Sequence, residues 1–97
     1  MKLGIVLATR GDLAAAHAIA LAARRARHEV ALFVMDAGCH ALAAEPAIAA
    51  SLLDADCEIT MCSNSAVGLE LPDAITRGSQ DDHAAVLATS DRVIALT

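Results

Sequence analysis

Short runs of apolar residues alternate along the chain with longer segments whose apolar positions recur at helical spacing. Residues 2–8 are almost continuously apolar, and the polar segment 9–12 ends this run. From residue 13 to about residue 27 the pattern is helical, with Asp12 placed to cap the first turn and arginines gathered in the last turns. A second apolar run at 28–35 then predicts a strand that is buried on both faces.

The same alternation continues through the rest of the chain. The segment Ser63-Asn64-Ser65 is rich in N-cap residues and predicts a short helix, and Ser79 with Asp82 resembles a capping box. Apolar strands that alternate with helices predict one α/β domain over residues 1–97, with three α/β/α layers and a parallel sheet of about five strands. The predicted strands are 2–8, 28–35, 57–62, 74–77 and 92–96, and the predicted helices are 13–27, 41–53 with a break at 45–46, 63–71 and 79–90.

Composition narrows the class of protein. Hydrophobic residues make up 57% of the 97, which excludes intrinsic disorder, and the 24 alanines predict a closely packed core of small side chains. Seven Lys+Arg against twelve Asp+Glu give a net charge of -5, and Trp and Tyr are absent, so binding to nucleic acid is not expected. The uncharged run 13–23 is far shorter than the roughly 20 apolar residues of a membrane span, so no membrane association is expected.

The cysteines bear on the cellular compartment. The apolar N-terminus is brief and lacks a small-residue cleavage site, so a first strand explains it better than a signal peptide does. Three cysteines without an export signal favour a reducing compartment with free thiols. The sequence therefore predicts a cytoplasmic protein.

In open parallel sheets, ligands and reactive groups collect at the carboxyl ends of the strands. Here these positions hold Thr9 and Arg10 after the first strand, residues 36–40 after the second, and Cys62, Ser63 and Asn64 after the third. Neither a G-x-G-x-x-G nor a G-x-x-x-x-G-K-[ST] motif is present, so the common nucleotide-binding loops are not expected.

Cys62 is the strongest candidate for chemistry. A thiol at a junction between a strand and a helix faces backbone N–H groups and the positive end of the helix dipole, both of which favour the thiolate. A phosphatase-like or rhodanese-like loop would require arginine at position 68, which is Gly68. The alternative is a structural cysteine buried in an apolar strand.

The other cysteines and the histidines are weaker candidates. Cys39 follows the second strand and could approach Cys62 as a resolving thiol, and His40 beside it could supply charge or a proton. Cys57 opens the third strand at its far end and is expected to be inert. No histidine stands at zinc-ligand spacing from a cysteine, so neither a metal nor a cofactor is expected.

Two parts of the chain resemble a known family. One extends from Val6-Leu7-Ala8-Thr9-Arg10 through the alanine-rich helix into residues 28–34. The other is Ile59-Thr60-Met61-Cys62-Ser63-Asn64-Ser65-Ala66, followed by Gly78-Ser79 and by residues 90–94. On these motifs nearly the whole chain resembles the DsrE/DsrF-like (TusD/YchN-like) sulfur-relay family.

The resemblance implies a five-stranded parallel α/β/α fold and assembly into a homo- or hetero-oligomer. It also implies a sulfurtransferase or sulfur-carrier subunit that receives sulfane sulfur from a donor protein and passes it to an acceptor protein. The cysteine that carries the sulfur as a persulfide corresponds to Cys62. Family members often follow this cysteine with basic residues, where this chain has Gly68-Leu69-Glu70, so His40 and Arg10 are the candidates to replace that charge.

Two alternatives to sulfur transfer stay open at this level. The chain could be a non-catalytic scaffold subunit of a DsrE-like oligomer, with Cys62 merely buried. It could also be a small-ligand-binding module that uses the loops at the strand ends.

Overall fold

The computed structural model describes residues 1–97 and contains a five-stranded parallel sheet in the order β4-β3-β2-β1-β5. This arrangement confirms the predicted α/β fold. Most strand and helix limits lie within one or two residues of the predicted ones, but the helix predicted from residue 41 begins at Ala37, inside a segment expected to be a loop. The strands are β1 (Lys2–Leu7), β2 (Glu29–Val34), β3 (Glu58–Cys62), β4 (Thr76–Gly78) and β5 (Arg92–Leu96), and the helices are α1 (Leu13–Arg25), α2 (Ala37–Ala43), α3 (Pro46–Asp54) and α4 (Gln80–Thr89).

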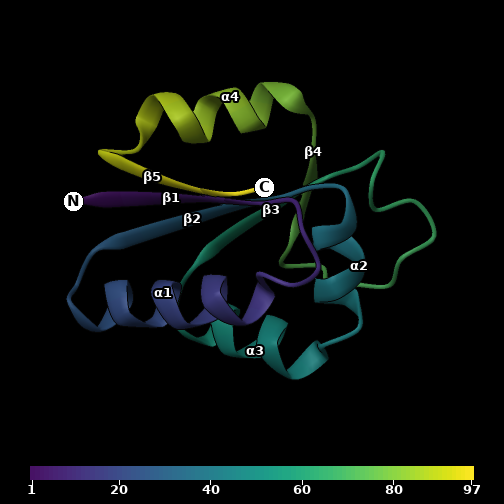
Figure 1. The fold of residues 1–97 in the computed structure, drawn as a ribbon, viewed down its shortest axis with the longest axis horizontal. Coiled ribbons are helices and arrows are strands. Elements are labelled where there is room, and N and C mark those ends of the chain that lie inside the picture. The colour runs from purple at the N-terminus through teal and green to yellow at the C-terminus, as the bar shows by residue number, and fades with distance from the viewer.

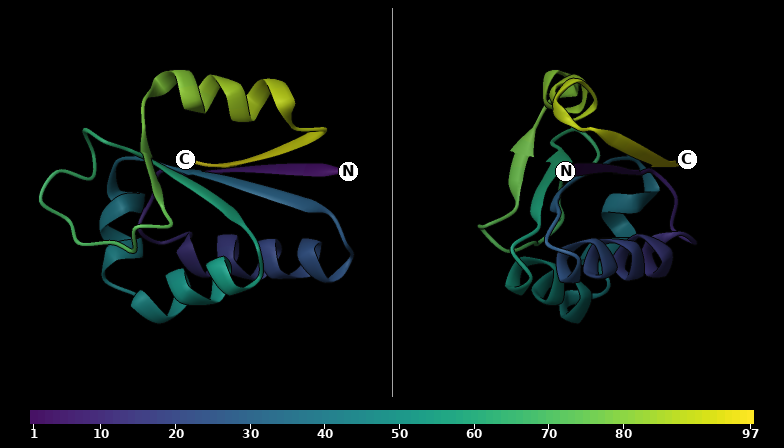
Figure 2. Two further views of the ribbon diagram at one scale, coloured as in Figure 1. Left: turned by 180° about the vertical axis from the view of Figure 1, so that it is seen from behind. Right: turned by 90° about the vertical axis from the view of Figure 1, so that its left-hand side faces the viewer.

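The order of the strands explains why the two faces of the sheet are covered unequally. The chain moves in one direction across the sheet from β1 through β2 and β3 to β4, and only the step from β4 to β5 returns to the opposite edge. Because crossovers between parallel strands are right-handed, the early helices share one face and α4 lies on the other. Figures 1 and 2 show α1, α2 and α3 on one side of the sheet and α4 alone on the other.

Each face has its own buried cluster. Eighteen residues form the larger cluster between the sheet and the three helices. It includes Leu32 and Val34 of β2 and Ala16 and Ala20 of α1. The smaller cluster lies beneath α4. Its members are Ala31, Phe33, Cys62 and Val86.

Small residues allow α4 to lie close to the sheet. A Cβ atom added at Gly4 would stand 2.5 Å from Ser90 Oγ and 3.1 Å from a Val86 methyl group. One added at Gly78 would stand 2.3 Å from a carboxylate oxygen of Asp82 and 2.8 Å from the Thr60 methyl group. Both ends of α4 therefore approach the sheet at positions where a side chain cannot fit.

The predicted helix at 63–71 is wrong, because this segment forms consecutive turns and then irregular structure. The Arg77 guanidinium donates to the carbonyl oxygens of Ala66 (3.2 Å) and Leu69 (2.9 Å), which a helix would pair with its own amides. The N–H group of Ser63 donates to Gly78 O (2.9 Å), which ties the start of the segment to β4. Bonds to β4, together with the isolated turn bonds from Ala66 N–H to Cys62 O and from Leu69 N–H to Ala66 O, therefore take the place of a continuous helix.

The helix ends agree in part with the sequence signals. At α4, Ser79 Oγ accepts from the Asp81 N–H group (3.2 Å) and Asp82 accepts from the Ser79 N–H group (2.8 Å), which confirms the capping box. Asp12 occupies the N-cap position of α1, but its carboxylate accepts from the Thr9 hydroxyl instead of from a helix amide. No helix in the structure has the length and apolar character that a membrane crossing requires.

Candidate functional site

Cys62 is the last residue of β3, at the carboxyl end of the sheet and beneath the start of α4. Its neighbour in the register of β4 is Gly78, which has no side chain to cover the thiol. The Cys62 residue is 8% exposed. The thiol therefore lies at the boundary between the small cluster under α4 and the surface.

Polar groups of three neighbouring residues act on the Cys62 thiol. The backbone N–H group and the hydroxyl group of Ser65 lower the pKa of this thiol most, and the N–H group of Asn64 and the side-chain amide of Gln80 lower it further. Desolvation by burial acts in the opposite direction but is outweighed, so the pKa of Cys62 lies below the ordinary cysteine value of 9.0. These donors favour the thiolate.

The Ser65 hydroxyl is held in place by a second bond. Ser65 Oγ accepts from the backbone N–H group of Asp36 at 2.9 Å, so its own proton is free to point at the Cys62 sulfur. Asp36 follows β2 and has a φ of 51°, in the left-handed region that residues other than glycine rarely adopt. This backbone conformation at the end of β2 helps to orient the donor on the loop after β3.

The Gln80 side chain is positioned from α4. Gln80 is the first residue of this helix, and its Oε1 lies 3.0 Å from Nδ1 of His83, one turn further along. The His83 ring in turn stacks on Phe33 of β2, with ring centroids 4.9 Å apart and an interplanar angle of 11°. The site therefore joins β2, β3 and α4.

The other two cysteines are buried in the large cluster. Cys39 is 0% exposed in the large cluster, and its Sγ donates to Val34 O at 3.4 Å. Burial, followed by the charge of Cys62, raises the pKa of Cys39 to about 11. Cys57 also belongs to the large cluster, and burial raises its pKa. All three cysteines are free.

Of the other site residues predicted from the sequence, some lie beside Cys62 and others lie elsewhere in the structure. Asn64 belongs to the site through its backbone N–H group, and Ser63 is exposed beside it. Thr9 bonds Asp12 at the start of α1, and His40 is exposed on α2. Neither His40 nor Arg10 is among the groups that shift the Cys62 pKa. The groups that lower the Cys62 pKa are neutral hydrogen-bond donors.

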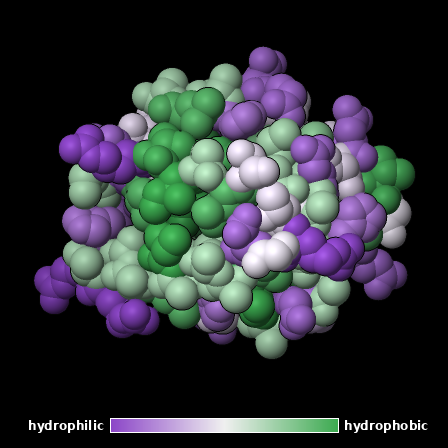
Figure 3. Space-filling model, viewed as in Figure 1, coloured by the Kyte–Doolittle hydropathy of each residue, from purple (hydrophilic) through white to green (hydrophobic).

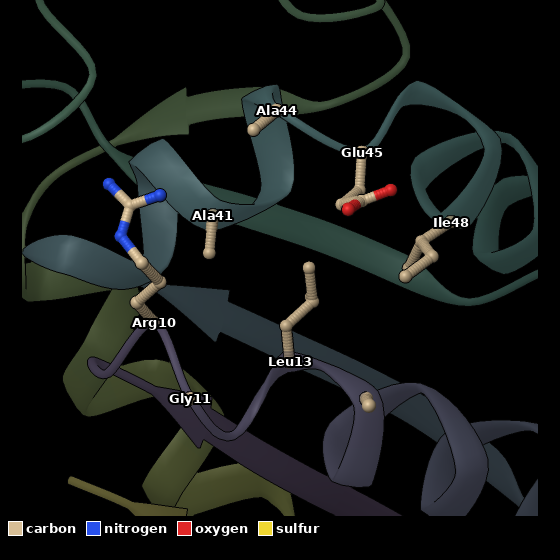
Figure 4. Close-up of a pocket in the computed structure, with 8 residues that line it drawn as sticks. Arg10, Gly11, Leu13, Ala41, Ala44, Glu45 and Ile48 are labelled. Atoms are coloured by element: carbon tan, nitrogen blue, oxygen red, sulfur yellow. The ribbon is translucent and has the colours of Figure 1, made fainter.

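Arg10 lies instead at a separate pocket of about 320 Å³ between the start of α1 and the α2–α3 connection. Figure 4 shows its guanidinium on one side of this pocket and Glu45 and Ile48 on the opposite side, with Leu13 between them. No residue of the Cys62 site lines it.

Sequence reasoning missed Ser65, Gln80 and His83 as parts of the site. A signal for Gln80 was present in the capping box, because that motif places Gln80 in the first turn of α4, directly after the strand that pairs with β3. The stacking of His83 on Phe33 had no signal in the local sequence, since it depends on which strand lies beneath α4.

Comparison with known proteins agrees with this architecture. A conserved protein of unknown function from Bacteroides thetaiotaomicron, BT1422, superposes with a TM-score of 0.77 at 14% sequence identity, over 98% of this chain and 94% of that one. No curated protein matches the sequence. The model of the DsrE/DsrF-like family matches residues 1–96. The chain therefore belongs to the DsrE/DsrF-like family.

Proposed function

We propose that this protein is a sulfur-relay protein that carries sulfane sulfur as a persulfide on Cys62. Membership of the DsrE/DsrF-like family indicates a sulfur-relay role in general. The observation that carries the finer assignment is that groups of Ser65, Asn64 and Gln80 favour the thiolate of a cysteine at the carboxyl end of an inner strand. Burial raises the pKa values of Cys39 and Cys57 instead.

The proposed reaction is an exchange between sulfur atoms without net oxidation. The Cys62 thiolate attacks the outer sulfur of a donor persulfide, the S–S bond of the donor breaks, and its electron pair leaves on the donor thiolate. Cys62 then carries the outer sulfur, and an acceptor thiolate removes it by the same type of attack. Both the entering thiolate and the persulfide anion are anionic, so the same donors serve the two states.

The main test is the position of the added sulfur. The reduced protein is incubated with a low-molecular-weight persulfide and then with an alkylating agent, and peptides are mapped by mass spectrometry. We expect a mass increase of one sulfur on the peptide that contains Cys62 and none after Cys62→Ser. Loading on Cys39 or Cys57, or unchanged loading in Cys62→Ser, contradicts the proposal.

A matched control separates sulfur transfer from a scaffold role. Cys57→Ser changes a cysteine of the same strand region that the proposal gives no role, so this variant should load like the wild type. A folded wild-type protein whose Cys62 reacts no faster than Cys57 with either persulfide or iodoacetamide would favour the scaffold alternative.

The proposal includes protein partners and self-association. Donor and acceptor proteins must reach the carboxyl end of β3, and the reaction requires a reducing compartment such as the cytoplasm. Figure 3 shows apolar side chains gathered where α4 and the edge strand β5 lie in Figure 1. Leu87 of α4 is 45% exposed and Val93 of β5 is 39% exposed. This surface and the unpaired edge of β5 support association with a further copy of the chain or a related subunit.

Sedimentation velocity tests the self-association. We expect the wild type to sediment as an oligomer at micromolar concentration and Val93→Lys to shift toward the monomer. A wild-type protein of monomer mass only would contradict a homo-oligomer.

A further inference from the structure

We propose that His83 is a positioning residue for the Cys62 sulfur: its Nδ1–H group holds the Gln80 side-chain amide so that the amide N–H group points at the sulfur. The inference rests on the proposed function only in taking Cys62 as the reacting residue. Its evidence is the series of contacts from Phe33 through His83 to Gln80 and the place of Gln80, two residues after Gly78, which pairs with Cys62. The Gln80 amide also favours the Cys62 thiolate.

The chemistry of the groups determines which one donates and which one accepts in each of these hydrogen bonds. A thiolate accepts hydrogen bonds, so the Gln80 amide must present its NH₂ group to Cys62 and its carbonyl oxygen to His83. An amide oxygen also only accepts, so the His83 Nδ1 atom at 3.0 Å must carry a proton. Every bond in the series thus has one donor and one acceptor, and each orients the next.

Packing against Phe33 fixes the orientation of the His83 ring. Phe33 is 0% exposed, and the imidazole lies nearly parallel to its ring at an interplanar angle of 11°. His83 itself is half-buried, whereas Gln80 is exposed and its flexible side chain makes one hydrogen bond, to His83. An exposed glutamine loses rotamer freedom when it is fixed, so a bond from a stacked ring lowers the cost of presenting its amide to the sulfur.

Two substitutions separate the ring from its N–H group. His83→Phe keeps an aromatic ring against Phe33 but removes the donor to Gln80. His83→Asn removes the ring but retains a side-chain N–H group near the place of Nδ1. If positioning depends on the N–H group, His83→Phe should disturb Cys62 and His83→Asn should restore much of the wild-type behaviour.

The readout is the rate of Cys62 alkylation by iodoacetamide as a function of pH, measured on the full chain by peptide mass spectrometry. We expect the midpoint of the His83→Phe profile to move upward, with an alkylation rate at pH 7 about threefold lower than in the wild type. His83→Asn should lie closer to the wild type. His40→Phe, a matched change at an exposed histidine of α2, should have no effect.

Gln80→Leu keeps the test decisive if a His83 variant folds poorly, because position 80 is exposed. This variant should raise the midpoint, and adding His83→Phe to it should cause no further shift, because the two residues act through one bond. Three results would overturn the proposal. The alkylation midpoint could be unchanged in His83→Phe, it could shift equally in His83→Phe and His83→Asn, or the shifts of Gln80→Leu and His83→Phe could add in the double variant. Alkylation does not require persulfide, so a shifted midpoint with no sulfur loading would refute the proposed function and retain the role of His83.

Discussion

The Ser65 hydroxyl is the side chain that most strongly favours the Cys62 thiolate, and Ser65→Ala removes it while keeping the backbone N–H group. A hydrogen bond to a charged group contributes about 1.5–3 kcal/mol, and solvent at this partly exposed loop reduces that value. We therefore expect the pKa of Cys62 to rise, and its alkylation at pH 7 to slow by up to about tenfold, which corresponds to roughly 1.4 kcal/mol.

The assay is the pH profile of Cys62 alkylation, for which the loop provides its own control. Ser63→Ala alters a serine two positions earlier whose backbone N–H bonds Gly78 O, and Ser63 is exposed. Its profile should match the wild type. Ser65→Thr retains a hydroxyl group and should recover most of the effect.

Stability gives an independent measure with a defined sign. Because folding lowers the pKa of Cys62, its thiolate adds stability that is fully present above the unfolded pKa near 9.0 and is lost as pH falls through the folded pKa. The free energy of unfolding of Ser65→Ala should therefore fall further below the wild type at pH 9 than at pH 6. An unchanged alkylation midpoint in Ser65→Ala, or an equal shift in Ser63→Ala, would refute the reasoning.

Three further predictions concern stability and are measured by urea unfolding. Asp56→Gly should stabilise the protein by about 1 kcal/mol, since Asp56 has a φ of 62° just after α3 and places a negative charge at the negative end of that helix. Asp54→Gly changes a residue inside the last turn of α3 and should destabilise the protein. Arg24→Ala should cost about 1–3 kcal/mol, because its guanidinium donates to Ala55 O and His28 O at 2.8 Å each, whereas exposed Arg25→Ala should have little effect. Between pH 9 and 11 the wild type should lose stability, because unfolding releases the Cys39 thiol from a pKa of about 11, and Cys39→Ala should lose less.

The sequence was sufficient for the fold because each strand carried a simple signal. Continuous apolar runs at β1 and β2 indicate strands buried on both faces, and such strands require helices on both sides of a parallel sheet. The pattern did not determine the strand order. That order depends on pairings between distant segments, such as Leu3 with Arg92, which no local window contains.

The loop after β3 shows where local signals fail. Ser63, Asn64 and Ser65 have high preference for a helix N-terminus, and the prediction of a helix followed from that preference. In the structure the donors of Asn64 and Ser65 serve the Cys62 sulfur, and Arg77 of β4 takes the carbonyl groups of the loop. Tertiary partners thus outweigh the local preference, and they do so where the candidate site lies.

The unequal covering of the sheet connects the fold to the chemistry. Three helices bury one face, and the cysteines on that face have raised pKa values. A single helix covers the other face, so the end of β3 stays near the surface while α4 brings Gln80 and His83 to it. The crossover that returns the chain from β4 to β5 therefore has two roles: it completes the core above Phe33, and it supplies donors to a thiol that an additional covering helix would bury.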